Sequence, residues 1–143
     1  MMTERKHIRI GYFEDFKGED SILISADIHG LIELEDVFLK LSNGLEYYDF
    51  SKLKLLDKIH RIDMNVFTEK NNIGLKKTEK DKYEWRLCKE KWGEFREKIT
   101  AMYRLRNEGH HYLDSDSEAN DDYQVVLSLN EYPEDFWEKY SLR

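Results

Sequence analysis

Side chains that could do chemistry are densest between residues 109 and 122. This segment holds two histidines and five carboxylates, namely His110, His111, Asp114, Asp116, Glu118, Asp121 and Asp122. Neutral imidazole and carboxylate suit zinc, manganese or iron, so His110 or His111 with Asp114 is a candidate divalent-metal site and the centre of a small metal-assisted enzyme. Adjacent side chains point in opposite directions in an extended chain, so one histidine at most would face a given metal. The alternative is a solvated acidic loop.

The same segment does not match an EF-hand calcium loop. Asp114, Asp116 and Glu118 have the spacing of its first ligands. However, Ala119 stands where the turn needs glycine, and Val125 stands where the bidentate glutamate belongs. We therefore reject this calcium motif.

Nucleophilic and nucleotide chemistry have little support. Cys88, the single cysteine, lies near Arg86 and Lys89 at a predicted strand-to-helix junction, where a helix N-terminus can lower a thiol pKa. A structural cysteine is the commoner case. The chain contains no Gly-x-Ser-x-Gly elbow and no glycine-rich phosphate loop. Apart from the metal of the alternative hypothesis, we expect no cofactor.

Nucleic-acid binding is a second alternative, through a basic hairpin at residues 76–86. Its cations are Lys76, Lys77, Lys80, Lys82 and Arg86, and Tyr83 and Trp85 are interleaved with them. An exposed ribbon of this kind can follow a phosphate backbone and stack on bases. The net charge of −7 opposes the binding of a polyanion. Alternatively, both aromatic side chains face the core, and we do not expect nucleic acid as the main partner.

The net charge hides three blocks of different sign. Residues 1–51 carry 5 basic and 11 acidic side chains, residues 52–106 carry 16 and 9, and residues 107–143 carry 2 and 10. Either the folded chain interleaves these blocks, or it has an acidic and a basic side. The second case would let the acidic side attract a basic protein.

These features favour a small acidic protein-binding module without enzymatic activity, which inhibits or neutralises a basic protein partner. Tyr47 and Tyr48 are further candidates for aromatic contacts, since aromatic residues dominate interface energetics. In its size, acidity and mixed secondary structure the chain resembles bacterial immunity proteins that neutralise a toxin, although no motif carries this likeness. The candidate partner-binding residues are Asp114, Asp116, Asp121, Asp122, Trp137 and Tyr140.

Hydrophobic periodicity predicts the elements that must position these residues. Apolar residues at helical spacing predict helices at about 30–43 and 89–107, the second with a stripe of Trp92, Phe95, Ile99 and Met102. Period-two alternation predicts strands within residues 7–13, 21–27, 45–50, 62–66, 73–77, 83–87 and 123–129. Residues 51–60 fit either a helix or a loop.

So many adjacent strands do not suit a doubly wound parallel sheet. We expect an α+β fold, in which one antiparallel sheet of about five to seven strands carries both main helices on one face. A short C-terminal helix is expected after Pro133. The absence of repeats and linkers predicts a single domain over residues 1–143.

The sequence also predicts a cytoplasmic protein that does not enter the membrane. Apolar runs reach about three residues, as at residues 22–24, whereas a bilayer span needs about 20. Residues 1–7 are partly basic, but no apolar stretch of a cleaved signal peptide follows them. A single cysteine agrees with a reducing compartment.

Overall fold

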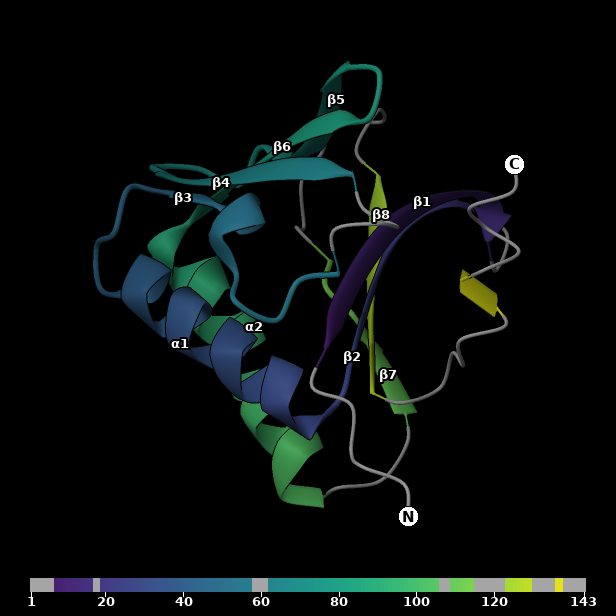
Figure 1. The fold of residues 1–143 in the computed structure, drawn as a ribbon. Helices are drawn as coiled ribbons and strands as arrows, with labels where there is room; N and C mark the ends of the chain where they lie inside the picture. The colour runs from purple at the N-terminus through teal and green to yellow at the C-terminus, as the bar shows by residue number, and fades with distance from the viewer. Residues whose placement is uncertain are drawn as a thin grey trace.

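In the part of the chain that the structure describes, two four-stranded sheets and a pair of helices surround one main core (Figure 1). The computed structural model describes residues 7–16, 19–57, 62–105, 109–114, 123–129 and 136–137. The expected class, α+β, is confirmed. The expected single sheet is wrong, because the strands divide into two sheets.

The first sheet has the strand order β1-β2-β8-β7. β1 (Ile8–Phe16) and β2 (Glu19–Ala26) are antiparallel, β2 and β8 (Gln124–Leu129) are parallel, and β8 and β7 (Gly109–Tyr112) are antiparallel. Alternate side chains of β1 and β2 are fully buried, among them Ile8, Ile10, Ile22 and Ile24. The period-two pattern therefore placed these strands correctly, although it could not predict that β2 pairs with β8.

The second sheet has the strand order β3-β4-β6-β5. Its strands are β3 (Tyr47–Asp49), β4 (Asp63–Glu69), β5 (Gly74–Glu79) and β6 (Lys82–Cys88). β4 and β6 are parallel, and each also has an antiparallel partner. The expectation of a wholly antiparallel sheet is thus wrong for both sheets.

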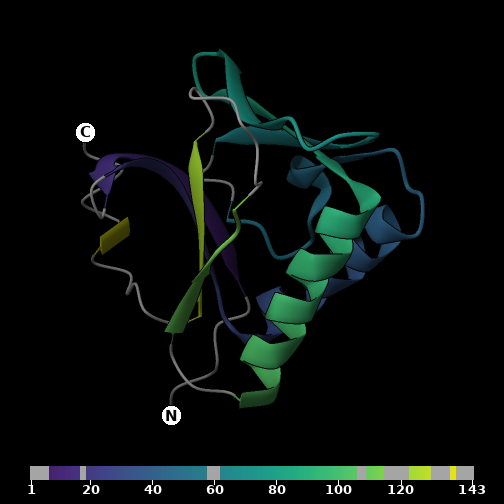
Figure 2. The same ribbon diagram turned by 180° about the vertical axis from the view of Figure 1, so that it is seen from behind.

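Both sheets follow the same plan, in which two antiparallel pairs are joined in parallel through their second strands. The second sheet is nested within the first, since β3 to β6 lie between β2 and β7 in the sequence. One helix precedes the nested sheet and the other follows it. This arrangement brings the two helices together beside both sheets (Figures 1 and 2).

Helix α1 (Ile28–Ser42) begins where Asp27 accepts a hydrogen bond of 2.8 Å from the Gly30 N–H. An acidic side chain at this position satisfies one of the free N–H groups of the first turn. Leu31, Leu34 and Phe38 form its buried face. Gly30 is required here because a Cβ would overlap the backbone oxygen of His7.

Helix α2 (Lys89–Leu105) buries all four residues of the predicted stripe, Trp92, Phe95, Ile99 and Met102. It lies antiparallel to α1, since Ser42 approaches Gly93 and Glu35 contacts Thr100 and Tyr103. Both helices end within two residues of their predicted boundaries.

One hydrophobic cluster joins both sheets and both helices. At its centre Phe38 of α1 lies 6.1 Å from Trp85 of β6 and 5.3 Å from Trp92 of α2, measured between ring centroids. Trp85 and Trp92 meet edge to face at 5.0 Å, a favoured geometry for aromatic pairs. A second cluster, made of Phe13, Leu23, Val126 and Trp137, covers the other face of the first sheet.

Three regions differ from the sequence prediction or extend it. Residues 109–112, expected in a loop, form the edge strand β7. The ambiguous segment contains a 3-10 turn, Phe50–Lys52, and a bridge between Leu56 and Ile8, while residues 58–61 lie outside the described part. Of the expected C-terminal helix, the structure describes Phe136 and Trp137, which are helical.

Candidate functional site

The strand β7 sets the directions of the two candidate metal-binding histidines. His110 pairs with Ser128 and His111 with Leu127, so the two imidazoles lie on opposite faces of the first sheet. Asp114 is exposed beyond the end of this strand. Within the described ranges, no three His, Cys, Asp or Glu side chains come together as a metal-binding group.

His111 lies in an environment that disfavours its charged form. Partial burial lowers the pKa of the imidazole below 6.5, and the positive charge of Lys98 and then His110 lower it further. Lys98 also donates a hydrogen bond of 3.1 Å to the Tyr112 carbonyl. The side chain thus prefers to be neutral near physiological pH.

The candidate partner-binding residues fall into three groups. Asp116, Asp121, Asp122 and Tyr140 lie outside the described residues. Asp114 is exposed, as a contact residue must be. Trp137 is fully buried, with its ring 5.7 Å from Phe13 and 6.0 Å from the Arg9 guanidinium. The Trp137 side chain therefore belongs to the core, because a strongly apolar ring gains more from burial than from exposure.

The basic hairpin lacks the exposed aromatic residues that base stacking needs. Tyr83 and Trp85 point inward and are buried, whereas Lys77, Lys80 and Lys82 are exposed. Cys88 ends β6 half-buried, and its N–H donates a hydrogen bond to Asn72. The aromatic residues at this hairpin thus serve the core.

A different surface brings together side chains suited to recognition. We call the face of the second sheet that points away from the helices the open face (Figure 1). The strand register places on it Tyr47 and Asp49 of β3, Asp63, Asn65, Phe67 and Glu69 of β4, Lys82, Glu84, Arg86 and Cys88 of β6, and Gly74 and Lys76 of β5. The opposite face carries Tyr48, Val66, Trp85 and Leu75 toward the core.

Tyr47, Phe67 and Arg86 form one row across three neighbouring strands of the open face. The Tyr47 and Phe67 ring centroids are 5.0 Å apart, and the Arg86 guanidinium carbon lies 3.9 Å above the Phe67 ring centroid. Tyr47 is 46% exposed, and its hydroxyl donates a hydrogen bond of 2.7 Å to Asn65. This hydrogen bond and the ring contact hold the Tyr47 side chain against Phe67.

Two carboxylates hold Arg86 over the ring. Its terminal nitrogens lie 3.2 Å from Glu69 and 2.9 Å from Glu84. Burial opposes the charge, but these hydrogen bonds and the nearby carboxylates outweigh it and raise the pKa of Arg86 above its ordinary value. The row is therefore a pair of rings in contact, capped by a permanently charged, paired guanidinium.

Acidic groups outnumber basic ones on this face. The four acidic residues are Asp49, Asp63, Glu69 and Glu84, and the three basic residues are Lys76, Lys82 and Arg86. Exposed Glu46 is the neighbour of Tyr47 in the sequence. From sequence alone, Tyr47 is a candidate contact, but Phe67 and Arg86 were missed. The period-two pattern assigns them outward directions, yet their juxtaposition depends on pairing between β3, β4 and β6.

No protein-family model, curated protein or solved structure matches this chain. Neither described helix is both long and apolar enough to cross a membrane.

Proposed function

We propose that this protein is a non-enzymatic binding protein that holds a basic protein partner against the open face and blocks the surface it covers. The observation that carries the proposal is the row of Tyr47, Phe67 and Arg86. Aromatic residues and arginine are enriched where binding energy concentrates in protein interfaces. Pre-positioned rings also lose little conformational entropy on binding.

The charge of the open face supports a basic rather than an acidic partner. Arg86 is occupied by Glu69 and Glu84, so its charge is balanced within the face. Asp49 and nearby Glu46 then give the surface around Tyr47 an acidic character, whereas Asp63 lies opposite Lys82 at the other end of β4. Such carboxylates attract a basic partner and speed its encounter, in keeping with the net charge of −7.

The acidic segment 114–122 is a second element that we assign to this partner. Tyr123, the first described residue after it, donates a backbone hydrogen bond to Leu75 of β5. Tyr123 therefore lies beside an edge of the second sheet. The carboxylates of the segment include Asp114, Asp116, Asp121 and Asp122, which we expect to contribute mainly through long-range attraction.

The proposal is tested by affinity capture from the native host, comparing the wild type with Tyr47→Ala and Tyr112→Ala. Tyr112 is a matched control because it is 42% exposed and lies on the other sheet. The wild type and Tyr112→Ala should retain one basic protein in stoichiometric amount. Tyr47→Ala should bind that protein about tenfold more weakly, the effect of removing an interface anchor.

Salt and charge reversal give an independent check with the captured protein. Affinity should fall as salt increases, and reversal of Asp114, Asp116, Asp121 and Asp122 to lysine should reduce this salt dependence. The proposal is wrong if the captured protein is acidic, or if Tyr47→Ala and Tyr112→Ala bind it equally well. Circular dichroism of each variant must first show a wild-type fold.

A further inference from the structure

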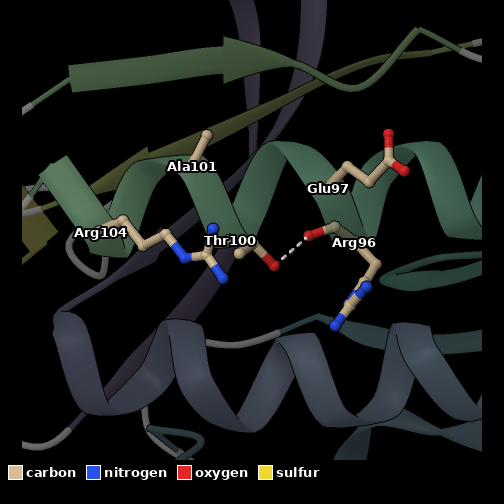
Figure 3. Close-up of a pocket in the computed structure, with 5 residues that line it drawn as sticks. All are labelled: Arg96, Glu97, Thr100, Ala101 and Arg104. Atoms are coloured by element: carbon tan, nitrogen blue, oxygen red, sulfur yellow. Dashed lines mark hydrogen bonds between the residues drawn. The ribbon is translucent and has the colours of Figure 1, made fainter.

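The outer side of α2 carries two arginines at an eight-residue separation with a threonine midway between them. Arg96, Thr100 and Arg104 line a depression of about 290 Å³ together with Glu97 and Ala101. The Arg96 and Arg104 side chains are directed toward α1, whereas Glu97 and Ala101 are directed away from it (Figure 3). Residues four apart lie on one face of a helix, which explains this alignment.

Glu35 of α1 lies beside Thr100 and is held by neutral donors rather than by these arginines. Glu35 accepts hydrogen bonds from the hydroxyls of Thr100 and Tyr103. Within the described part of the chain, neither Arg96 nor Arg104 forms an ion pair. Two guanidinium groups thus border the depression with their charges unbalanced by a direct contact.

Arg96 also has an unsatisfied donor. Its Nε is buried and lacks a hydrogen-bond acceptor among the described residues. A buried donor left in this state costs about 1–3 kcal/mol, and more when the group is charged. Native proteins satisfy most such groups with protein or ordered-water partners, so a water molecule or an anion would complete this one.

We propose that this depression binds an oxyanion, a carboxylate or a phosphate group, between Arg96 and Arg104. Guanidinium groups match the planar oxygen pairs of both ligands and bind them through two parallel hydrogen bonds. The lining residues supply two positive charges and one negative charge, from Glu97, and Glu35 of α1 brings a second carboxylate to Thr100. The volume, 290 Å³, is several times the share of one water, about 30 Å³, and leaves room for the group that carries the anion.

This site is separate from the proposed partner-binding face. It lies on the outer side of α2, whereas the inner side of α2 packs toward the second sheet through Trp92 and Phe95. The open face points away from both helices. Failure of one proposal therefore leaves the other intact.

The test is a nuclear magnetic resonance titration of the full chain with inorganic phosphate and, separately, with succinate, against sodium chloride at equal ionic strength. The Nε–H signals of Arg96 and Arg104 should shift and saturate with at least one oxyanion, and the responding probe distinguishes phosphate from carboxylate. Arg96→Gln and Arg104→Gln should each weaken binding about tenfold. Glu97→Gln should strengthen it by removing a repulsive charge.

Lys89→Gln serves as the control, because it removes one positive charge from an exposed position in the first turn of the same helix. It should leave the affinity within about twofold of the wild type. The proposal is overturned if neither probe gives a saturable shift beyond that of chloride. It is equally overturned if Lys89→Gln weakens binding as much as both arginine variants do.

Discussion

At the scale of single residues, neighbouring histidines show how backbone geometry limits chemistry. His110 and His111 are adjacent in sequence, but β7 sends their side chains to opposite faces of the first sheet. His110 shares a row with Ser128, Ser25 and Arg9, and His111 shares the next row with Leu127 and Ile24. The side chains of two ligands must point toward the same metal ion. Successive residues of a strand point to opposite faces of the sheet, so these two histidines do not.

The pKa of His111 predicts a pH-dependent contribution to stability. Because its pKa is lowered in the folded protein, the unfolded chain binds more protons between that pKa and 6.5. The contribution of neutral His111 to stability is complete above pH 6.5, the ordinary pKa. It is lost as the pH falls through the lower pKa of the folded protein. Thermal midpoints measured from about pH 7.5 to about pH 5 should therefore fall more for the wild type than for His111→Gln.

Parallel midpoint curves for the two proteins would contradict this prediction. Comparing the two curves is necessary because carboxylates also titrate as the pH approaches 5. Their contribution is common to the wild type and the variant and cancels in the difference.

At the scale of secondary-structure elements, glycine positions distinguish close packing from open space. Gly30 lies in the first turn of α1, against the first sheet. A Cβ there would lie 2.8 Å from Ile8 Cγ1 and 3.0 Å from Ala26 Cβ and would overlap the His7 backbone oxygen. Gly93 lies within α2, where a Cβ would be 3.6 Å from Ser42 Cβ, an ordinary contact. The same substitution must therefore have opposite effects at the two positions.

Gly30→Ala should lower the free energy of unfolding by about 1–3 kcal/mol, because backbone must move to admit the methyl group. Gly93→Ala should raise it by about 0.5–1 kcal/mol, because alanine favours the helix and the site has room. Urea unfolding at equilibrium measures both changes. A Gly30→Ala protein as stable as the wild type would show that α1 does not approach β1 and β2 this closely.

At the scale of the whole molecule, the shared core determines how the two sheets behave. Phe38 of α1 lies between aromatic residues of the second sheet and of α2, and the same cluster continues into the first sheet through Ile8, Ile10 and Leu127. Helix α1 belongs to the acidic block of residues 1–51, and α2 belongs to the basic block of residues 52–106. The two helices pack along each other. The two blocks therefore meet inside the fold at the helix pair.

Replacement of Phe38 by alanine should reveal this coupling. The loss of a buried phenylalanine costs about 3–5 kcal/mol, and both sheets should lose stability together. Far-ultraviolet circular dichroism and tryptophan fluorescence should report one common urea midpoint in the wild type and a lower common midpoint in Phe38→Ala. Ile32→Ala, which alters a 48% exposed side chain on the same helix, should change stability by less than about 0.5 kcal/mol.

Separate midpoints for the two signals would contradict a single cooperative unit. They would indicate that one sheet unfolds while the other persists, so the nested sheet would have a stability of its own. Tryptophans report on both regions, since Trp85 and Trp92 lie in the main cluster and Trp137 lies beyond the first sheet.

The sequence by itself determined the local elements of this protein. The stripe of Trp92, Phe95, Ile99 and Met102 predicted α2, and alternation predicted most strands, because periodicity depends on near neighbours. It also identified Tyr47 as a candidate contact. The sequence pattern did not predict the short strand β7, because its four residues are one glycine, two histidines and one tyrosine and show no clear apolar alternation.

Only the tertiary structure decided how those elements pair and which surface they leave open. Parallel pairing of β2 with β8 brings Ser21 to Gln124, 103 positions away, and no local pattern specifies such a partner. Likewise, Tyr47, Phe67 and Arg86 form a row through the register of three strands. Periodicity sets the direction of each side chain, but strand register and helix packing choose its neighbours.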